Sequence, residues 1–311
     1  MNEQTPKIAV TPPAFCKSQA LRAELSSHFP NTIFNEQDRY LSGAELVDFL
    51  ADADAALIGR DAMDAEQIRA LPELKMISKY GVGLDNLDQD ALKRANIELR
   101  VTPGTNKRSV AELTLGFMIS LCHNMFSGSE QLKSGNWRRD GGQELTGKTI
   151  GIIGCGNVGQ ELVRLLQPFQ CKIRVQDVAD RSNFCREWNV VETTFEEIIA
   201  ESDIVTLHVP LTDKTQNLID KSVLAKMKPS AFLINTSRGE VVPQSDLHQA
   251  LVSGEIAGAG LDVFSEEPPT DTEFLQLPNL IVTPHIGGNA HEAVEAMGRA
   301  AIKNLVAYFK L

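Results

Sequence analysis

A glycine-rich segment in the middle of the chain has the residue types and spacing that bind a dinucleotide. An apolar run, Thr149–Ile153, leads into G-x-G-x-x-G and then into a helix-like stretch. In such a site the first glycine makes the tight turn, the second lets the backbone approach a pyrophosphate, and the third allows close packing of helix on strand. The N–H groups at the helix N-terminus then face the phosphates. The residues expected to bind the cofactor here are Gly154, Gly156, Asn157, Val158 and Gly159. The alternative is an ordinary strand-to-helix turn.

A carboxylate follows at the distance that such a site requires. The next apolar run, Lys172–Gln176, ends in Asp177, 18 residues after Gly159. A carboxylate at this place can accept hydrogen bonds from both ribose hydroxyls of NAD and would repel the 2′-phosphate of NADP. Arg174 and Arg181 lie nearby in the sequence and could weaken that preference. We therefore expect NAD as the cofactor; the alternative for Asp177 is a helix cap or a solvated acid.

Polar side chains that could carry out chemistry follow four apolar runs in the second half of the chain. The four segments are His208–Thr212, Asn235–Gly239, Asp262–Pro268 and Thr283–Gly288. Ligands of open α/β sheets bind outside the carboxyl ends of the strands, which is where each segment would lie. The four segments can therefore converge on one site.

The elements that must position these residues are short strands alternating with helices. This alternation is typical of βαβ units and parallel sheets, and nearly continuous apolar runs are typical of strands covered on both faces. Strands are expected in a first set at Ile8–Val10, Ala55–Ile58, Met76–Ser78 and Ile97–Val101, and in a second set at Thr149–Ile153, Lys172–Gln176, Asp203–Leu207, Ala231–Asn235, Ala259–Val263 and Leu280–Thr283. The predicted fold class is α/β with two doubly wound parallel-sheet domains. Because about 150 residues precede the glycine motif, the nucleotide domain is expected to be an insertion.

A long helix is expected between the two sets of strands, over Ser109–Lys133. Apolar residues recur at helical spacing, and Ser109 with Glu112 has the pattern of a capping box. A helix this apolar needs a partner surface, so it either joins domains or subunits or packs in a core.

Composition limits the classes of function. The 311 residues are 42% hydrophobic, which excludes disorder, and a net charge of −11 disfavours nucleic acid as a partner. The longest apolar stretch, Leu113–Cys122, is much shorter than the roughly 20 residues of a membrane span. Met1–Gln4 shows no start of a secretory signal, and the five cysteines are scattered, odd in number and without C-x-x-C spacing. We expect a cytoplasmic protein with no membrane partner, no disulfide framework and no metal site.

The motifs together resemble the D-isomer-specific 2-hydroxyacid dehydrogenases. The resemblance extends from Lys79–Asn86 through Ser109–Glu112 to the segment around His285, nearly the whole chain. It implies a Rossmann NAD-binding domain at residues 102–286, inserted into a flavodoxin-like substrate domain at residues 1–101 and 287–311.

By this resemblance Arg238, Glu267 and His285 match the catalytic arginine, glutamate and histidine of the family. The residue types suit the chemistry, because reducing a 2-oxo acid needs a hydride at the carbonyl carbon and a proton at its oxygen. Imidazole titrates near physiological pH, and Glu267 beside it would favour the protonated form. Arg238 can hold the carboxylate and polarise the carbonyl with one planar fork. Taken singly, each of the three could be structural.

The resemblance also implies binding residues. The loop that contains Val82 and Gly83 would bind the substrate carboxylate through its N–H groups, and its alternative is a plain tight turn. Arg60 matches a basic residue that faces the substrate in phosphoglycerate enzymes; its alternative is a surface charge. Asn106 would contact cofactor or substrate. Further cofactor contacts are expected from His208, Val209, Pro210, Thr236, Ser237 and Asp262.

The predicted function is hydride transfer between NAD(H) and a D-2-hydroxy or 2-oxo acid by a homodimer. The first choice of substrate is 3-phosphoglycerate, with its oxidised form 3-phosphohydroxypyruvate. The alternatives are a hydroxypyruvate/glyoxylate or D-lactate type of reductase. An NAD(H)-sensing protein similar to the corepressors built on this fold is the alternative from another class.

Overall fold

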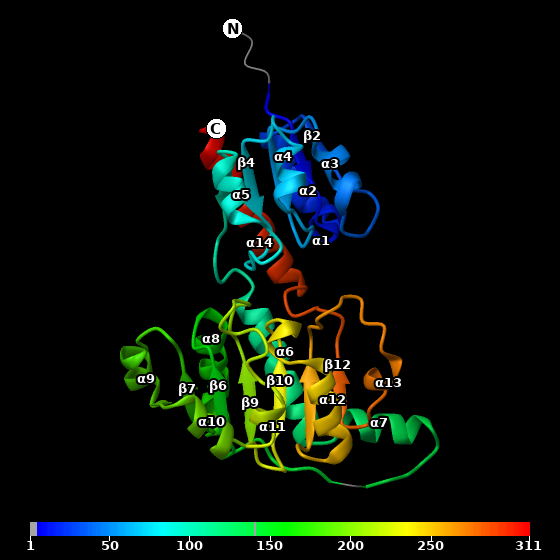
Figure 1. Cartoon of the computed structure of the whole chain (residues 1–311), viewed down its shortest axis with the longest axis vertical. Coiled ribbons are helices and arrows are strands. Elements are labelled where there is room, and N and C mark those ends of the chain that lie inside the picture. The colour runs from blue at the N-terminus through cyan, green and yellow to red at the C-terminus, as the bar shows by residue number, and fades with distance from the viewer. Residues whose placement is uncertain (1–4, 140) are drawn as a thin grey trace. The chain divides into compact units, whose positions relative to one another are not determined.

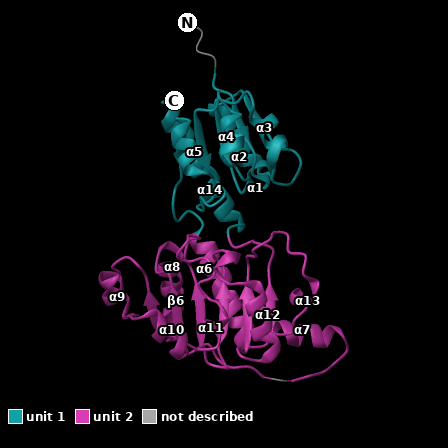
Figure 2. Ribbon diagram, in the orientation of Figure 1, with its two compact units in different colours: residues 1–106, 288–311 teal, residues 107–287 magenta. Residues whose placement is uncertain are grey.

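The computed structural model describes residues 5–139 and 141–311, so the segment Met1–Gln4 lies outside the described residues. The chain divides into two compact units, each with its own sheet (Figure 2). Unit 1 comprises residues 1–106 and 288–311, and unit 2 comprises residues 107–287. The domain boundaries expected from the sequence, after residues 101 and 286, remain predictions.

Unit 1 is built on a five-stranded parallel sheet with strand order β2-β1-β3-β4-β5 (Figure 1). This is the flavodoxin-like order, with the switch point between β1 and β3. The strands are β1 (Ile8–Val10), β2 (Thr32–Phe34), β3 (Ala55–Ile58), β4 (Met76–Lys79) and β5 (Glu98–Arg100). The sequence patterns missed β2, because this edge strand is only half-buried and no continuous apolar run marks it.

Helices cover both faces of the unit 1 sheet. They are α1 (Pro13–Lys17), α2 (Gln19–His28), α3 (Gly43–Leu50), α4 (Ala65–Arg69), α5 (Gln89–Arg94) and α14 (His291–Phe309). Side chains alternate along each strand: Ile8 and Val10 pack with α1, α2 and α14, while Ala9 packs with the helices on the other face. The last helix of the chain therefore completes the core of the unit in which the chain begins.

Unit 2 is built on a seven-stranded parallel sheet with strand order β12-β11-β10-β9-β6-β7-β8. If β6 is counted as strand 1, the order from β8 to β11 reads 3-2-1-4-5-6, which is the dinucleotide-binding order, and β12 is one further strand at the edge. The predicted fold class is therefore confirmed. The strands are β6 (Thr149–Ile153), β7 (Lys172–Gln176), β8 (Val191–Glu192), β9 (Ile204–Leu207), β10 (Phe232–Asn235), β11 (Gly258–Leu261) and β12 (Leu280–Val282). The two-residue edge strand β8 is exposed and was not predicted.

The core of unit 2 contains two apolar clusters. Two of the helices of this unit precede β6 in the chain, and the others lie between its strands. The helices are α6 (Lys107–Cys122), α7 (Met125–Lys133), α8 (Asn157–Leu166), α9 (Ser182–Trp188), α10 (Phe195–Glu201), α11 (Lys221–Leu224), α12 (Gln244–Ser253) and α13 (Thr272–Leu275), with short 3-10 turns at Gln167–Phe169 and Gly239–Val241.

The single helix expected over Ser109–Lys133 is two helices. Asn124 adopts a left-handed conformation with φ +51°, which ends α6 and starts α7. Asparagine tolerates this conformation better than most residues, so the break is local. α6 packs into the core of unit 2 through Phe117 and Leu121, whereas α7 buries none of its residues. In Figure 1, α7 extends away from the sheet of this unit.

The capping box expected at Ser109 is also absent. The helix starts two residues earlier, at Lys107, so Ser109 lies inside its first turn. The Ser109 hydroxyl donates to the carbonyl of Gly287 at 2.5 Å, and Glu112 binds Arg108 at 2.6 Å. Ser109 therefore ties α6 to the end of the last loop of unit 2.

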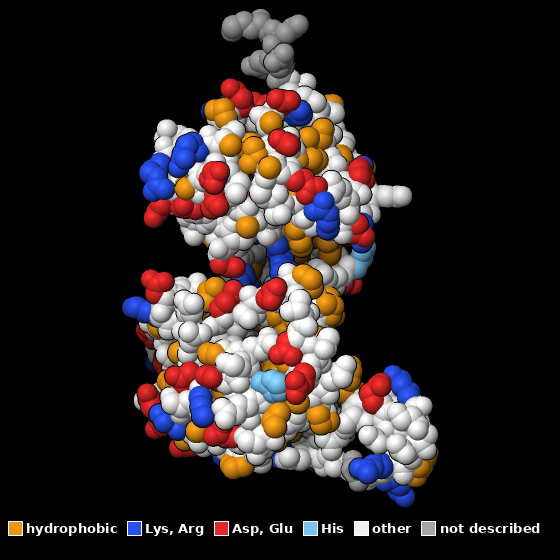
Figure 3. Space-filling view, turned by 45° about the vertical axis from the view of Figure 1, so that its right-hand side comes forward, with side chains coloured by type: hydrophobic (Ala, Val, Ile, Leu, Met, Phe, Trp, Pro, Cys, Tyr) orange, Lys and Arg blue, Asp and Glu red, His pale blue; other side chains and the backbone are white. Residues whose placement is uncertain are grey.

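No helix in residues 5–139 and 141–311 is long and apolar enough to cross a membrane. On the face shown in Figure 3, acidic and basic side chains are interspersed. The five cysteines are free, and four of them are buried.

Candidate active site

The glycine turn after β6 is shaped by close contacts that exclude side chains. Gly154 has φ +93°, and a Cβ at this position would lie 2.4 Å from the carbonyl oxygen of His208. A Cβ on Gly159 would lie 2.3 Å from the carbonyl oxygen of Gly154. Both contacts are shorter than van der Waals distance, so only glycine allows the first turn of α8 to pack on the end of β6.

The middle glycine differs, because it faces open space. A Cβ on Gly156 would meet no atom within 4 Å, and no side chain caps the N-terminus of α8 at Asn157. The first turn of α8, with its N–H groups and the positive end of the helix dipole, therefore begins beside open space on the Cβ side of Gly156. This region fits the pyrophosphate of a dinucleotide.

Asp177 lies directly after β7, at the edge of the sheet where the glycine turn lies. Its side chain is largely buried, with one oxygen 3.3 Å from Nε of Arg181 and the other accepting the N–H of Ala179 at 2.8 Å. Arg181 is thus paired with Asp177, while Arg174 pairs with Glu201 at 2.5 Å. The carboxylate is held in place where a ribose would lie in a Rossmann site.

The segment after β9 borders the same turn. A Cβ on Gly154 would meet the carbonyl of His208 and a methyl group of Val209. Pro210 is the next residue in the chain. Burial lowers the pKa of His208 to about 3, and its Nε2 lies 3.1 Å from the hydroxyl of Thr206. The His208 ring is therefore neutral, and its backbone forms one wall of the dinucleotide region.

Glu267 and His285 form a direct pair. Nδ1 of His285 lies 2.9 Å from one carboxylate oxygen of Glu267 and 3.0 Å from the other. One of these oxygens also accepts the N–H of Phe264 at 3.0 Å, which fixes the carboxylate on its loop. The two residues follow β11 and β12, which are neighbours in the sheet. Both side chains are partly accessible, so the pair can reach a ligand.

Asp262 organises the loop that carries His285. One of its oxygens accepts the hydroxyl of Thr283 at 2.6 Å and the N–H of Ile286 at 2.8 Å, and the other accepts the N–H of Gly287 at 2.8 Å. His285 itself has φ +53°. Burial raises the pKa of the Asp262 carboxyl, and the three hydrogen bonds oppose that rise. The sequence could not indicate this backbone role, which depends on β11 lying beside β12.

Arg238 follows β10, and the preceding residues shape its turn. The side chain of Asn235 accepts the N–H and the hydroxyl of Ser237 at 3.0 and 2.8 Å and donates to the carbonyl of Arg238 at 2.7 Å. The hydroxyl of Thr236 lies 3.0 Å from that of Thr114 on α6. Asn235 was not predicted as a site residue, although an asparagine at a strand end before a turn is a recognisable signal.

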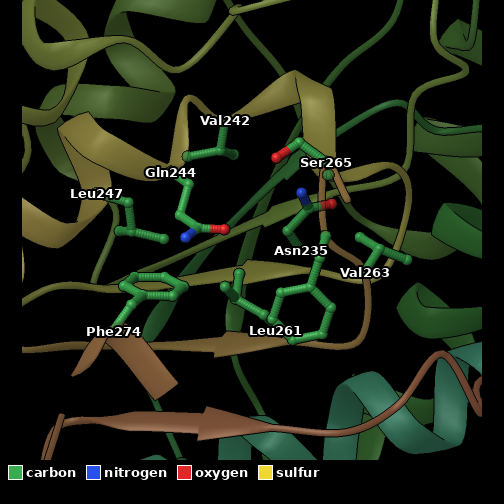
Figure 4. A pocket seen from close by; sticks show the side chains of 10 residues that line it. Asn235, Val242, Gln244, Leu247, Leu261, Val263, Ser265 and Phe274 are labelled. Carbon is green, nitrogen blue, oxygen red and sulfur yellow. The ribbon is translucent and has the colours of Figure 1, made fainter. Parts of the chain in front are cut away.

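The Arg238 turn packs directly on the Glu267 loop. A Cβ on Gly239 would lie 1.9 Å from the carbonyl carbon of Phe264. A small, mainly apolar pocket lies beside this contact, with Asn235 and Ser265 at one end and Leu247 and Phe274 at the other (Figure 4). Its lining has no charged side chain, so it does not suit an acid substrate.

The four residues expected to bind substrate all belong to unit 1. Arg60 follows β3, and Val82 and Gly83 lie in the loop after β4, so these three share the carboxyl edge of neighbouring strands. Asn106 ends the first part of unit 1, and its amide nitrogen would lie 3.0 Å from a Cβ on Gly288.

Comparison with known proteins identifies the family. The model of the D-isomer specific 2-hydroxyacid dehydrogenase NAD-binding domain matches residues 115–287. The chain is 37% identical to the hydroxypyruvate reductase of Thermotoga maritima, over 86% of this chain and 88% of that one. It is 38% identical to the glyoxylate reductase of Thermococcus litoralis, over 80% and 78%.

Two further similarities concern related activities. The chain is 37% identical to the D-3-phosphoglycerate dehydrogenase of Methanocaldococcus jannaschii, over 83% of this chain but 50% of that one. The crystal structure of D-lactate dehydrogenase from Aquifex aeolicus, complexed with NAD and lactic acid, superposes with a TM-score of 0.87 at 27% identity and covers 98% of this chain and 96% of that chain.

The chain belongs to the D-isomer-specific 2-hydroxyacid dehydrogenase family. It is an NAD-dependent oxidoreductase acting on 2-hydroxy acids, as the resemblance and the glycine motif predicted.

Proposed function

We propose that this enzyme reduces glyoxylate and hydroxypyruvate with NADH. The observation that carries the proposal is the Glu267–His285 pair, 2.9 Å apart, at the sheet edge that also carries the glycine turn. The first choice made from sequence, 3-phosphoglycerate, has less support. Relatives named glyoxylate or hydroxypyruvate reductase match most of their own length, whereas the phosphoglycerate relative is matched over 50% of its length.

His285 is the proposed proton donor. Its Nδ1 binds Glu267, so Nε2 is the nitrogen that exchanges a proton with the substrate oxygen. Glu267 holds the ring in one orientation through its two carboxylate oxygens. NADH, when bound, supplies the hydride to the carbonyl carbon. Carbon then gains the hydride and oxygen the proton, which gives a 2-hydroxy acid; in the oxidative direction His285 is the base.

Arg238 is proposed to hold the substrate carboxylate and polarise the carbonyl. Its turn is fixed by Asn235 and by the contact between Gly239 and the Glu267 loop, which supports an arginine of defined position. A guanidinium can bind both carboxylate oxygens with two parallel hydrogen bonds.

The remaining site residues are proposed in supporting roles. In unit 1 the N–H groups of Val82 and Gly83 bind the substrate carboxylate. Arg60 contacts the end of the substrate farthest from that carboxylate, and Asn106 contacts cofactor or substrate. In unit 2 the proposed cofactor contacts are Gly154, Gly156, Asn157, Val158, Gly159, Asp177, His208, Val209, Pro210, Thr236, Ser237 and Asp262.

We also propose that the enzyme is a cytoplasmic homodimer. Its five free cysteines suit a reducing compartment. Helix α7 exposes Met125, Phe126 and Leu132 and buries no residue, which supports burial of this helix against a second copy.

The test is the initial rate of NADH oxidation with glyoxylate, hydroxypyruvate, 3-phosphohydroxypyruvate and pyruvate, repeated with NADPH. The highest kcat/KM is expected for glyoxylate or hydroxypyruvate with NADH.

His285→Ala should abolish most turnover and retain NADH binding; turnover near that of wild type would refute the proton-donor role. Tight NADH binding without turnover of any acid would favour the sensor alternative.

A further inference from the structure

Two buried charges in unit 1 have no part in the proposed hydride and proton transfer. Asp61 is 1% exposed and Lys79 is 4% exposed. A buried charge is costly unless it is paired and hydrogen-bonded, so both side chains must be held by strong partners. Both bind Gly59, the residue before Arg60: the Asp61 carboxylate accepts its N–H at 3.2 Å, and the Lys79 ammonium donates to its carbonyl.

Asp61 also ties the turn Gly59–Asp61 to its surroundings. Its carboxylate accepts the N–H of Leu41 at 2.8 Å and the hydroxyl of Thr11, at the end of β1. The turn is therefore anchored to the neighbouring strand as well as to β4, where Lys79 lies.

Asn86, which follows the loop Gly81–Gly83 in the chain, binds the turn Gly59–Asp61 as well. Its side chain donates to the carbonyl of Gly59 at 3.2 Å and to that of Asp61 at 2.6 Å. Its own carbonyl accepts the N–H of Met63 at 2.9 Å. Lys79 precedes the loop Gly81–Gly83 and Asn86 follows it, so the carbonyl of Gly59 binds donors from both ends of that loop.

Arg60 is itself held over an aromatic ring. Its guanidinium carbon lies 5.6 Å from the ring centroid of Tyr40, within the range of a cation–π contact. A Cβ on Gly59 would lie 2.8 Å from this ring and 3.1 Å from Pro12. Glycine at position 59 therefore allows the ring to lie on the turn and support Arg60.

We propose that the turn Gly59–Asp61 and the loop Gly81–Gly83 form one rigid element, the Arg60 clamp, in which Lys79 and Asn86 are positioning residues. The clamp fixes the distance between the N–H groups that bind the carboxylate and the guanidinium of Arg60. It thereby selects 2-oxo acids by the polar or anionic group that they carry beyond the carbonyl. The inference rests on the proposed function, which already places Arg60 at the far end of the substrate, and adds to it the positioning role of Lys79 and Asn86.

The selection follows from the chemistry of the substrates. Glyoxylate has only a hydrogen atom on its carbonyl carbon and cannot use Arg60 in this way, whereas hydroxypyruvate has a hydroxyl group and 3-phosphohydroxypyruvate a phosphate. A contact with a charged group contributes about 1.5–3 kcal/mol, which corresponds to roughly 10-fold to 100-fold in affinity. Movement of Arg60 relative to the loop would reduce this discrimination without affecting glyoxylate.

The test is a double-mutant cycle with Arg60→Ala and Asn86→Ala. The quantity measured is the ratio of kcat/KM for hydroxypyruvate to that for glyoxylate. We expect each single variant to lower the ratio, Arg60→Ala by roughly 10-fold, and the double variant to lower it no further than the more severe single variant. Asn31→Ala, at an exposed asparagine of unit 1, is the matched control and should leave the ratio unchanged.

A purely structural role of Asn86 would lower kcat/KM for both acids alike and leave the ratio unchanged, which would overturn the proposal. Independent, multiplicative effects of the two substitutions would also overturn it. Asn86→Ala removes a neutral donor, and Lys79→Arg, which keeps the positive charge but changes the donor to the carbonyl of Gly59, gives a second variant expected to lower the ratio.

Binding of the two reduced acids separates this inference from the proposed function. The dissociation constants of D-glycerate and glycolate are measured by calorimetry on the NADH-loaded enzyme, in which neither acid can react. We expect the clamp variants to weaken D-glycerate binding and to spare glycolate, even if turnover shows another preferred substrate. Equal losses for both acids, or no binding of D-glycerate to the wild type, would refute the clamp.

Discussion

Two carboxylates act on His285 in different ways. Glu267 binds the imidazole, with both oxygens within 3.0 Å of Nδ1, while Asp262 binds the backbone and the hydroxyl on either side of the histidine. One acid thus sets the orientation of the ring and the other sets the path of its loop. Preorganisation of this kind matters because a displacement of about 1 Å can cost roughly 100-fold in rate.

Replacing Asp262 with alanine should therefore lower kcat by about 100-fold while His285 and Glu267 remain intact. Three hydrogen bonds to the loop are lost, and each contributes about 1 kcal/mol to folding. Steady-state kinetics and urea denaturation check both effects. Glu266→Ala removes a neighbouring exposed acid as a control. An unchanged kcat would show that the loop keeps its path without Asp262.

Replacing Asp177 with alanine should shift the cofactor preference toward NADPH. The substitution removes the carboxylate that would repel a 2′-phosphate and releases Arg181, now 3.3 Å away, to bind it. The ratio of KM for NADPH to KM for NADH should fall by about tenfold or more. Asp180→Ala, at an exposed acid nearby, should leave it unchanged. An unaltered ratio in Asp177→Ala would disprove the ribose contact.

At the scale of elements, the starts of β6 and β9 carry stabilising contacts, at the ends of these strands opposite the candidate site. Asp203 precedes β9 and accepts the N–H of Thr149 at 2.9 Å and the ammonium of Lys228 at 2.8 Å. It thus joins the starts of β6 and β9, while the carboxyl ends of these strands carry the glycine turn and the His208 segment.

The contribution of Asp203 to stability should depend on pH. Burial raises its pKa, but the hydrogen bonds from Lys228 and Thr149 outweigh burial and hold the pKa below its ordinary value. The folded state therefore gains stability above the unfolded pKa, about 3.9, and loses it as the pH falls through the lower folded pKa. Asp203→Asn should cost about 1 kcal/mol at pH 7.

Urea denaturation of wild type and Asp203→Asn at several pH values checks this. The difference in unfolding free energy should be constant from pH 7 down to about 4 and shrink below that. Asp213→Asn, at an exposed position, should match the wild type throughout. A difference that grows toward low pH would contradict the direction of the shift.

At the scale of the whole molecule, each unit has a core of its own. The first strands and the last helix, α14, share one apolar cluster, so both ends of the chain stabilise unit 1. The apolar side chains of α7 contribute to no such cluster among the described residues, and Phe126 is 55% exposed. Solvent exposure of several large side chains on one helix is unfavourable, which is why burial against a second copy is proposed.

Replacing Phe126 with aspartate should therefore convert the proposed dimer into a monomer. A charge in an apolar interface loses hydration without gaining a partner. Light scattering during size-exclusion chromatography measures the mass directly. Val252→Asp, at an exposed valine of α12, is the matched control and should keep the wild-type mass. A dimer that persists in Phe126→Asp, or a monomeric wild type, would argue against the α7 interface.

The interior strands and the glycine turn could be predicted from sequence because their signals are local. A strand covered on both faces must be apolar along its length, as in β3 and β9, and close backbone contacts at Gly154 and Gly159 admit only glycine. The edge strands β2 and β8 lack this constraint and were missed. The break at Asn124 was also missed, because a single left-handed residue leaves helical periodicity intact on both sides.

The contacts that shape the candidate site were decided only by the tertiary structure. Asp262 reaches the His285 loop because β11 pairs with β12, and Lys79 reaches Gly59 because β3 pairs with β4. The sequence by itself determined the family, the cofactor and the residue types available for catalysis. The partner of each polar side chain depends on strand order and register, because residues far apart in the chain become neighbours only when parallel strands pair.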